Sequence, residues 1–393
     1  MNRTLSAFYL TGSLRELIPI YPLYAIMFTE RGISPIELSL LFSAWALIGI
    51  ITEIPSGALA DRLGRKWLIV ASGFFKAAAF LSWFFWQDFY GYLIGFLLWG
   101  FGSTLKSGAW EALLFETLGT RHQSNQFTAH NGRIKALAQI GVVIGELAGG
   151  FLIIWGWDTV LLISAAVPVL ATLPFIFLVR DIPRPSRDQN YLAILKAGVI
   201  ETMTNRTISF LFLSVAFLLV IFGVYDEYAA PVLSEGGFSH AWVAWLFAAI
   251  YVAKAIGHVV AGWYTRVQIP TLVTLMGVSG LSLALLPLVS GWWLPTLLAI
   301  FFFVFGFAST LLDGKLQDQI TGHARATVTS TVGLGDGFGA ILWFMIFGVM
   351  AESFGMIGAS VGLSALMCIS CVTLYALATR WRISDIQHPQ TRE

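Results

Sequence analysis

The sequence predicts an all-helical polytopic membrane protein in which twelve transmembrane helices form two six-helix bundles. Of its 393 residues, 57% are apolar and 11% are charged, and the mean hydropathy is +0.77. Soluble globular domains carry about 25% charged residues, so this composition excludes an ordinary soluble enzyme. Twelve apolar stretches are long enough to cross a bilayer core of about 30 Å as helices, and one long polar stretch divides them six and six.

The apolar stretches follow one another through connections that are mostly too short to hold a separate folded domain. The expected spans are residues 5–28, 36–60, 67–86, 89–115, 127–154, 160–179, 207–230, 241–263, 271–289, 293–316, 326–349 and 356–378. The first span contains Arg15 and Glu16 and no small-residue cleavage site, so we expect a retained helix and not a signal peptide.

The longest polar stretch separates the sixth span from the seventh. It contains Pro183 and Pro185, and apolar residues recur at helical spacing between Leu192 and Met203. This spacing predicts a short amphipathic helix on the cytoplasmic surface, which is either a solvated tether or a partner-binding segment. The expected parts are an N-terminal six-helix bundle (1–180), a cytoplasmic linker (181–206) and a C-terminal six-helix bundle (207–393).

Basic residues between the spans predict the orientation of the chain. With the N-terminus in the cytoplasm, the inner segments hold fifteen of the 23 Lys and Arg residues, the outer loops hold Arg31, and seven lie inside spans. Because cytoplasmic loops are enriched in Lys and Arg, we expect both termini in the cytoplasm. The short loops favour a bacterial cytoplasmic (inner) membrane. The net charge of +1 argues against a nucleic-acid partner, and we expect a monomer in the lipid bilayer.

The loop between the second and third spans carries the most specific motif of the chain. Residues 57–66 read Gly-Ala-Leu-Ala-Asp-Arg-Leu-Gly-Arg-Lys. Gly57 and Gly64 allow a tight turn and close helix approach, and Asp61 can receive an arginine or face the positive end of a helix. The cations that hold the loop on the inner face are Arg62, Arg65 and Lys66.

This loop resembles the signature loop of the major facilitator superfamily, Gly-x-x-x-Asp-Arg-x-Gly-Arg-Arg/Lys, at every defined position. It also lies where that family has it. The resemblance implies the facilitator fold, in which spans one, four, seven and ten line a central cavity. It further implies that the loop latches the two halves on the cytoplasmic side in one of the alternating states. A basic loop that only fixes topology is the alternative.

A second pattern lies in the fifth span, where residues 141–150 read Gly-Val-Val-Ile-Gly-Glu-Leu-Ala-Gly-Gly. It is similar to the antiporter motif of drug-efflux members of the superfamily, Gly-x-x-x-Gly-Pro-x-x-Gly-Gly, with Glu146 in place of the proline. The similarity slightly favours export over import. Close packing of the glycines explains the pattern about as well.

Seven basic residues lie inside the expected spans, where a lipid-facing position near the helix centre costs roughly 2.5–3.5 kcal/mol. They are Arg15, Lys76, Lys106, Arg133, Lys135, Lys254 and Lys315. We therefore expect them to face protein or water. Acidic residues at matching depth predict three ion pairs, which are Glu111 with Arg133, Glu53 with Lys76, and Asp336 with Lys254.

Four charged residues in the first and fourth spans are candidates for the transport pathway: Arg15, Glu16, Lys106 and Glu111. The resemblance places these spans around the central cavity, and purely structural pairing is the alternative. A carboxylate that moves between an outward and an inward cavity changes its proton affinity, which lets a proton gradient bias transport. The carboxylates that could carry the proton are Glu16, Glu111, Glu146, Asp226 and Asp336. Two cations inside the spans, Arg133 and Lys254, lie at depths similar to those of acidic residues and are also candidates for the pathway.

These features predict a secondary active transporter that moves a small organic solute by alternating access, coupled to protons, with export slightly favoured. A proton-coupled importer or a facilitator of a polar or zwitterionic metabolite is the first alternative. A non-transporting sensor is another. We expect no enzymatic activity, catalytic residue, cofactor or metal site.

An intramembrane aspartyl protease is the remaining alternative. Tyr225-Asp226 and the Gly-Leu-Gly-Asp of residues 333–336 resemble the two motifs of those enzymes. In the expected topology, however, the two carboxylates differ in depth by roughly 13 Å, so they could not share a proton.

Overall fold

The computed structural model describes residues 3–119, 126–179, 204, 206–264, 267–319 and 325–381. Regular secondary structure in this part of the chain is helical throughout, which confirms the predicted all-helical membrane class. Nine helical segments within it are long and apolar enough to cross a membrane. By internal contacts the chain divides into two compact units, Met1–Gln189 with Gly237–Ala249, and Asn190–Gly236 with Ile250–Glu393.

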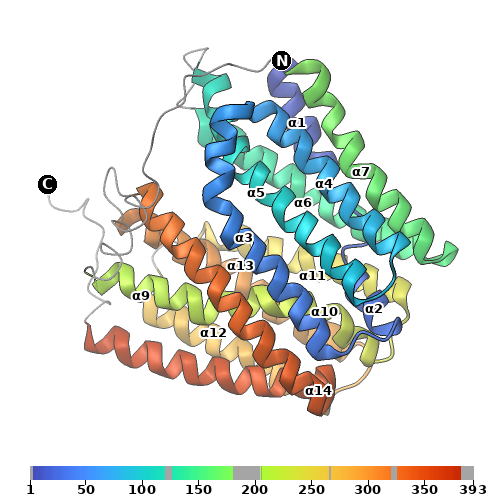
Figure 1. The fold of residues 1–393 in the computed structure, drawn as a ribbon. Coiled ribbons are helices and arrows are strands. Elements are labelled where there is room, and N and C mark those ends of the chain that lie inside the picture. The colour runs from blue at the N-terminus through green and yellow to red at the C-terminus, as the bar shows by residue number, and fades with distance from the viewer. Residues whose placement is uncertain are drawn as a thin grey trace, which may run out of the picture. The chain divides into compact units, whose positions relative to one another are not determined.

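The first unit contains the helices of the first six predicted spans (Figure 1). They are α1 (Arg3–Leu14), α2 (Tyr24–Glu30), α3 (Pro35–Leu63), α4 (Arg65–Phe85), α5 (Phe89–Gly119), α6 (Phe127–Leu152), the short 3-10 helix η2 (Ile153–Trp155) and α7 (Trp157–Leu178). α4 packs against α5 and α7, and α1 packs against α6 and α7. The start of α3 is fixed by a capping box, because the Ser34 hydroxyl accepts from the Glu37 N–H and the Glu37 carboxylate accepts from the Ser34 N–H.

The remaining helices supply the last six spans. They are α9 (Arg206–Ser214), the π-helical turn η3 (Val215–Leu219), α10 (Val220–Glu235), α11 (His240–Ala261), α12 (Ile269–Ala284), the 3-10 helix η4 (Leu286–Leu288), α13 (Trp293–Gln319) and α14 (Arg325–Arg380). α14 covers the last two spans, because the backbone turns at Gly355 with φ +73°. The predicted linker helix of residues 181–206 lies outside the described residues, apart from Thr204 and Arg206.

The turn inside α14 is capped by a side chain of α10. The Glu235 carboxylate accepts from the backbone N–H groups of Met356 at 2.7 Å and Ile357 at 3.4 Å. These amides begin the second segment of α14 and have no partner within that segment. Glu235 therefore satisfies a helix N-terminus and places a negative charge at its positive end.

The first predicted span is not one continuous helix. α1 ends at Leu14 and α2 begins at Tyr24, with non-helical backbone and turns over residues 15–23. Pro19 and Pro22 account for the break, because proline lacks a backbone N–H and disfavours helical geometry in the residue before it. The N–H of Ile20 donates to the Ser164 hydroxyl on α7 at 3.0 Å. The unwound segment is thus hydrogen-bonded by a neighbouring helix.

The glycines of α6 pack against this unwound segment and against the last turn of α1. A Cβ built on Gly145 would lie 2.6 Å from the amide nitrogen of Ile18, and Cβ atoms on Gly141 and Gly149 would meet carbonyl oxygens of Ser13 and Pro19. Glycines spaced one helical turn apart therefore let two backbones approach closely. The pattern that resembles the antiporter motif has this packing role in the structure.

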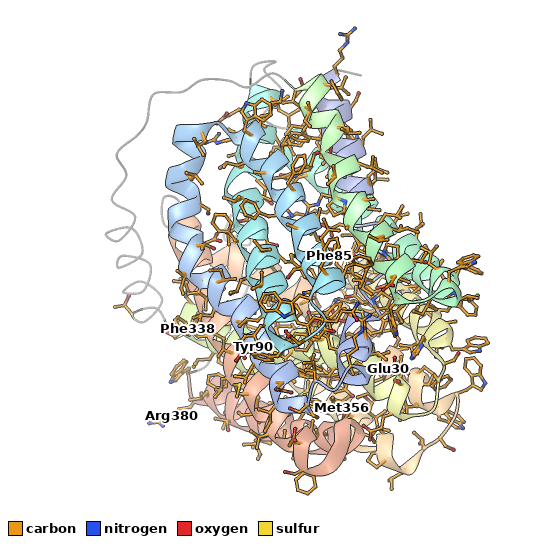
Figure 2. The ribbon with its side chains drawn as sticks, turned by 45° about the vertical axis from the view of Figure 1, so that its right-hand side comes forward. Glu30, Phe85, Tyr90, Phe338, Met356 and Arg380 are labelled. Atoms are coloured by element: carbon orange, nitrogen blue, oxygen red, sulfur yellow. The ribbon has the colours of Figure 1, made fainter. Side chains whose placement is uncertain are left out.

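Large apolar side chains fill the interior of the helical units and also cover their outer surfaces. Phe8, Trp110 and Phe175 form a buried aromatic cluster in the first unit, with ring centroids 5.0–5.4 Å apart. Phe85, which Figure 2 labels, is 77% exposed. Helices that are apolar on all faces are typical of proteins that contact lipid.

Candidate functional site

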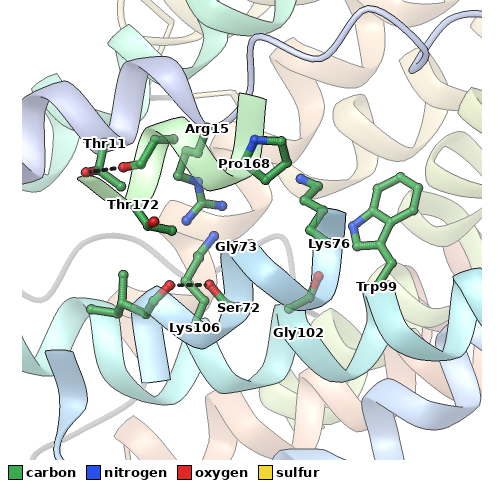
Figure 3. A pocket seen from close by; sticks show the side chains of 13 residues that line it. Thr11, Arg15, Ser72, Gly73, Lys76, Trp99, Gly102, Lys106, Pro168 and Thr172 are labelled. Atoms are coloured by element: carbon green, nitrogen blue, oxygen red, sulfur yellow. Dashed lines mark hydrogen bonds between the residues drawn. The ribbon is translucent and has the colours of Figure 1, made fainter. Parts of the chain in front are cut away.

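A cavity lies inside the first unit, between the end of α1 and helices α4, α5 and α7 (Figure 3). Its empty volume, including the open mouth, is about 450 Å³. The polar and aromatic side chains that line it include Thr11, Arg15, Lys76, Trp99, Lys106 and Thr172.

An ionic cluster borders the cavity. The Arg15 guanidinium donates from Nε to Glu16 Oε1 at 2.8 Å, and Lys76 Nζ lies 3.5 Å from Glu16 Oε2. The Tyr21 hydroxyl donates to the same Oε2 at 3.1 Å, and Lys76 in turn donates to Tyr21. The side chains of Arg15, Glu16 and Lys76 are 19%, 18% and 14% exposed. Glu16 is therefore a largely buried carboxylate held by two cations and a hydroxyl.

Aromatic rings surround the cations of this cluster. Tyr21 stacks on Trp99 with ring centroids 5.5 Å apart, and Lys76 Nζ lies 4.9 and 5.3 Å from these two centroids. Arg15 Cζ lies 5.5 Å from the centroid of Trp110. Cation–π contacts of this kind partly replace the water that a buried cation loses.

Lys106 on α5 enters the same cavity, and Figure 3 shows its side chain reaching toward that of Arg15. No residue in the described part of the chain forms a hydrogen bond or ion pair with Lys106. The cavity thus gathers three cations, Arg15, Lys76 and Lys106, around the single carboxylate of Glu16 that faces them within the described residues. The net charge of these four groups is +2 when all of them are ionised.

Small residues make room for the cavity and bring its walls together. A Cβ at Gly73 on α4 would meet the Cγ2 of Thr172 and, at 2.8 Å, the carbonyl oxygen of Pro168 on α7. A Cβ at Gly102 on α5 would lie 3.0 Å from the Cβ of Phe75 on α4. The close approach of α4 to both neighbours therefore depends on these two glycines.

The motif loop between α3 and α4 ties together the end of the first unit at which it lies. Gly64 has φ +85°, a left-handed conformation that suits glycine and turns the chain from α3 directly into α4. Arg65 forms an ion pair with Glu116 near the end of α5, and Lys66 Nζ donates to the Ile176 carbonyl of α7 at 2.9 Å. Gly57, Asp61 and Arg62 belong to the backbone of α3, and the side chains of Asp61 and Arg62 lie outside the described part of the structure.

A second ionic cluster lies in the second unit. Lys254 on α11 lies 3.4 Å from Asp226 Oδ2 on α10, and the Tyr251 hydroxyl donates to the same oxygen at 2.7 Å. The Lys254 ammonium also lies 4.7 Å from the ring centroid of Tyr251 and 4.8 Å from that of Phe305. The predicted pair of Lys254 with Asp336 is therefore wrong, and Asp336 is an exposed residue of α14.

The other two predicted ion pairs are also wrong. Glu111 pairs with Lys135 at 3.2 Å and accepts from Asn131 at 3.3 Å, whereas Arg133 is exposed on α6. Lys76 pairs with Glu16, and Glu53 accepts from Ser107 at 3.5 Å. Matching depth did not predict the partners, because each residue along a helix also turns about 100° around its axis.

The structure brings together three of the four predicted pathway residues. Arg15 and Lys106 line the cavity and Glu16 is bonded to Arg15, whereas Glu111 belongs to the separate pair with Lys135. Glu146 is buried in α6, with 1% exposure. Sequence reasoning missed Tyr21 and Trp99, for which no motif gave a signal. It also missed Lys76 as a cavity residue, although its charge inside a span was the signal that could have found it.

Comparison with known proteins identifies the family. The profile described as Major Facilitator Superfamily matches residues 4–344. An uncharacterized MFS-type transporter of Bacillus subtilis, YxaM, is 22% identical over 405 residues, which covers 98% of both chains. The multidrug resistance protein MdtG of Klebsiella pneumoniae is 31% identical over 177 residues, 44% of this chain and 42% of that protein.

Solved structures share the fold at low sequence identity. A mutant of the nucleoside transporter NupG has a TM-score of 0.78 at 13% identity, covering 95% of this chain and 98% of that one. A second structure is that of a bacterial homologue of the human lysosomal transporter Spinster in an inward-facing and unoccupied conformation. It has a TM-score of 0.78 at 15% identity, and the match covers 97% of this chain and 96% of that one.

Proposed function

Because this chain belongs to the Major Facilitator Superfamily, we propose that it is a secondary active transporter that moves a small organic solute by alternating access. The observation that carries the proposal is the buried ionic cluster of Arg15, Glu16, Lys76 and Lys106 beside an open cavity. Charged groups inside a membrane span are costly and typically mark a substrate or ion pathway.

The proposal includes coupling to protons. The Glu16 carboxylate is held by Arg15, Lys76 and Tyr21. A movement of the helices that lengthens these contacts, or admits water to them, changes how strongly the carboxylate holds a proton. A transport cycle in which proton and solute bind preferentially to different states is coupled to the proton gradient. The Asp226–Lys254 pair of the second unit offers a second carboxylate of the same kind.

Export from the cytoplasm is the proposed direction, in a bacterial cytoplasmic membrane with both termini inside. The names of two relatives support it, the multidrug resistance protein MdtG and the multidrug efflux protein YfmO of Bacillus subtilis. YfmO is 23% identical over 277 residues, which covers 66% of this chain and 65% of that protein. The motif loop acts in this scheme as a cytoplasmic latch through Asp61 and Arg62, while Arg65 and Lys66 fix the loop to α5 and α7.

The test begins with a thermal-shift screen of metabolites and drugs on the purified protein, since a bound solute stabilises the folded carrier. The solute found is then followed in proteoliposomes under an imposed pH gradient. We expect accumulation against the solute gradient, driven by the pH gradient and abolished by a protonophore. Flux that ignores the pH gradient would contradict proton coupling, and a protein that binds the solute without flux would contradict the carrier. The variant Arg31→Gln, at the outer end of α2, is the matched control and should transport like the wild type.

A further inference from the structure

The cavity of the first unit has an excess of positive charge over the acidic side chains that the structure describes around it. Both oxygens of Glu16 are engaged, Oε1 by Arg15 and Oε2 by Lys76 and Tyr21. Lys106 projects into the same space, where no described residue forms a hydrogen bond or a close ion pair with it. An uncompensated cation inside a membrane-spanning bundle is strongly unfavourable unless an anion or water completes its shell.

The hydrogen-bonding groups of the cavity wall also favour an anion. The hydroxyls of Thr11, Ser72 and Thr172 donate to backbone carbonyls of their own or neighbouring helices at 2.7–2.8 Å. The protons of these three hydroxyls are therefore already used. The cationic nitrogens of Arg15, Lys76 and Lys106 are the charged donors that remain at the cavity, beside the neutral donors of Ser103 and Trp99. Ionised donors make the strongest hydrogen bonds to carboxylate and phosphate oxygens.

We propose that this cavity binds the anionic group, a carboxylate or a phosphate, of the transported solute, with Lys106 and Arg15 as its direct partners and the ring of Trp99 beside its apolar part. The proposal rests on the proposed transport function and adds the chemical class of the substrate. Figure 3 shows the Arg15 and Lys106 side chains converging in the cavity, with Lys76 and Trp99 farther along it. A cationic solute would meet three like charges at this place, which discriminates against it.

The experiment compares four probes that share one phenyl ring and differ in charge: benzoate, phenyl phosphate, benzamide and benzylamine. Each is added at the same millimolar concentration to the purified full-length protein, and thermal unfolding is measured. We expect benzoate or phenyl phosphate to raise the Tm by about 2–4 °C, and benzamide and benzylamine to leave it unchanged. The two anions separate a carboxylate site from a phosphate site. Equal stabilisation by benzamide or benzylamine, or none by either anion, would overturn the proposal.

Three variants connect the binding to the cavity. Lys106→Gln should weaken anion affinity about tenfold or more, because a hydrogen bond to a charged group is lost. Lys106→Arg keeps the charge and should keep most of the shift in Tm. Arg31→Gln removes a cation of the same unit whose partner is the Tyr92 hydroxyl, and it should behave like the wild type. An anion response that survives Lys106→Gln would place the anion elsewhere and refute the assignment.

The outcome for the anion site is separable from that for transport. If anion binding depends on Lys106 but the protein shows no flux in proteoliposomes, the proposed transport function is refuted and the anion site is retained. Flux of a neutral or cationic solute would refute the anion site and leave the carrier.

Discussion

Replacement of Glu16 by glutamine should destabilise the protein far more than loss of one surface carboxylate. Lys76 Nζ lies 3.5 Å from Glu16 Oε2, and at an effective dielectric constant of about 20 this attraction amounts to about 5 kcal/mol before desolvation is subtracted. Arg15 bonds the other oxygen, and the side chains of the cluster are less than a fifth exposed. Breaking a buried pair by removing one partner costs about 3–5 kcal/mol, because the remaining charges stay buried. We expect Glu16→Gln to fall in that range.

A double-mutant cycle isolates the ion pair from other effects of the substitution. Lys76→Met removes the cation, so the double variant Glu16→Gln with Lys76→Met should recover about 2 kcal/mol or more relative to the sum of the single variants. Equilibrium unfolding in mixed detergent micelles gives the four free energies. The exposed pair of Glu111 and Lys135, with side chains 54% and 70% exposed, provides the matched control. Its coupling should stay below about 1 kcal/mol. Equal coupling in the two pairs, or additive single variants at Glu16 and Lys76, would refute the buried cluster.

Three further outcomes are expected. Asp61→Asn should slow transport, measured as flux, with little loss of membrane insertion, measured as surface-labelled protein. Unchanged flux would contradict the proposed role of the loop as a latch. Gly145→Ala should lower stability by about 1–3 kcal/mol, because its Cβ would lie 2.6 Å from the amide nitrogen of Ile18, whereas Gly132→Ala, which meets nothing within 4 Å, should be neutral or raise it. Thermal unfolding measures the stability of both variants, and a change of the same sign in Gly145→Ala and Gly132→Ala would contradict the packing argument. Glu235→Gln should cost about 1 kcal/mol by weakening the cap inside α14, measured by denaturant unfolding, and a neutral effect would show that the cap is dispensable.

Hydropathy was sufficient to predict the helical spans, because the length of an apolar stretch reports directly on the thickness of the bilayer core. The family resemblance rested on residues 57–66 and is confirmed by the match over residues 4–344. The break in the first span was not predicted, although Pro19 and Pro22 carried the signal. Two prolines three residues apart remove two backbone donors and restrict the residues before them.

The site was predicted less completely than the fold. Charge inside a span drew attention to Arg15, Glu16 and Lys106, which the structure brings together at one cavity, since such charge must find water or a partner. Depth along each span did not select the partners, and all three predicted pairs were wrong. The acid that pairs with Lys76 is Glu16, which lies in the unwound segment after α1. Helical periodicity could not predict where its side chain points, because the backbone there is not helical.

The unwound segment of residues 15–23 has a consequence for how the chain enters the membrane during synthesis. A newly made first span would expose backbone amides and carbonyls to hydrocarbon until Ser164 and the glycine face of α6 are present to cover them. These partners lie more than a hundred residues later in the sequence. The N-terminal segment is therefore poorly suited to leave the translocon by itself, and its stable integration should await the fifth and sixth spans.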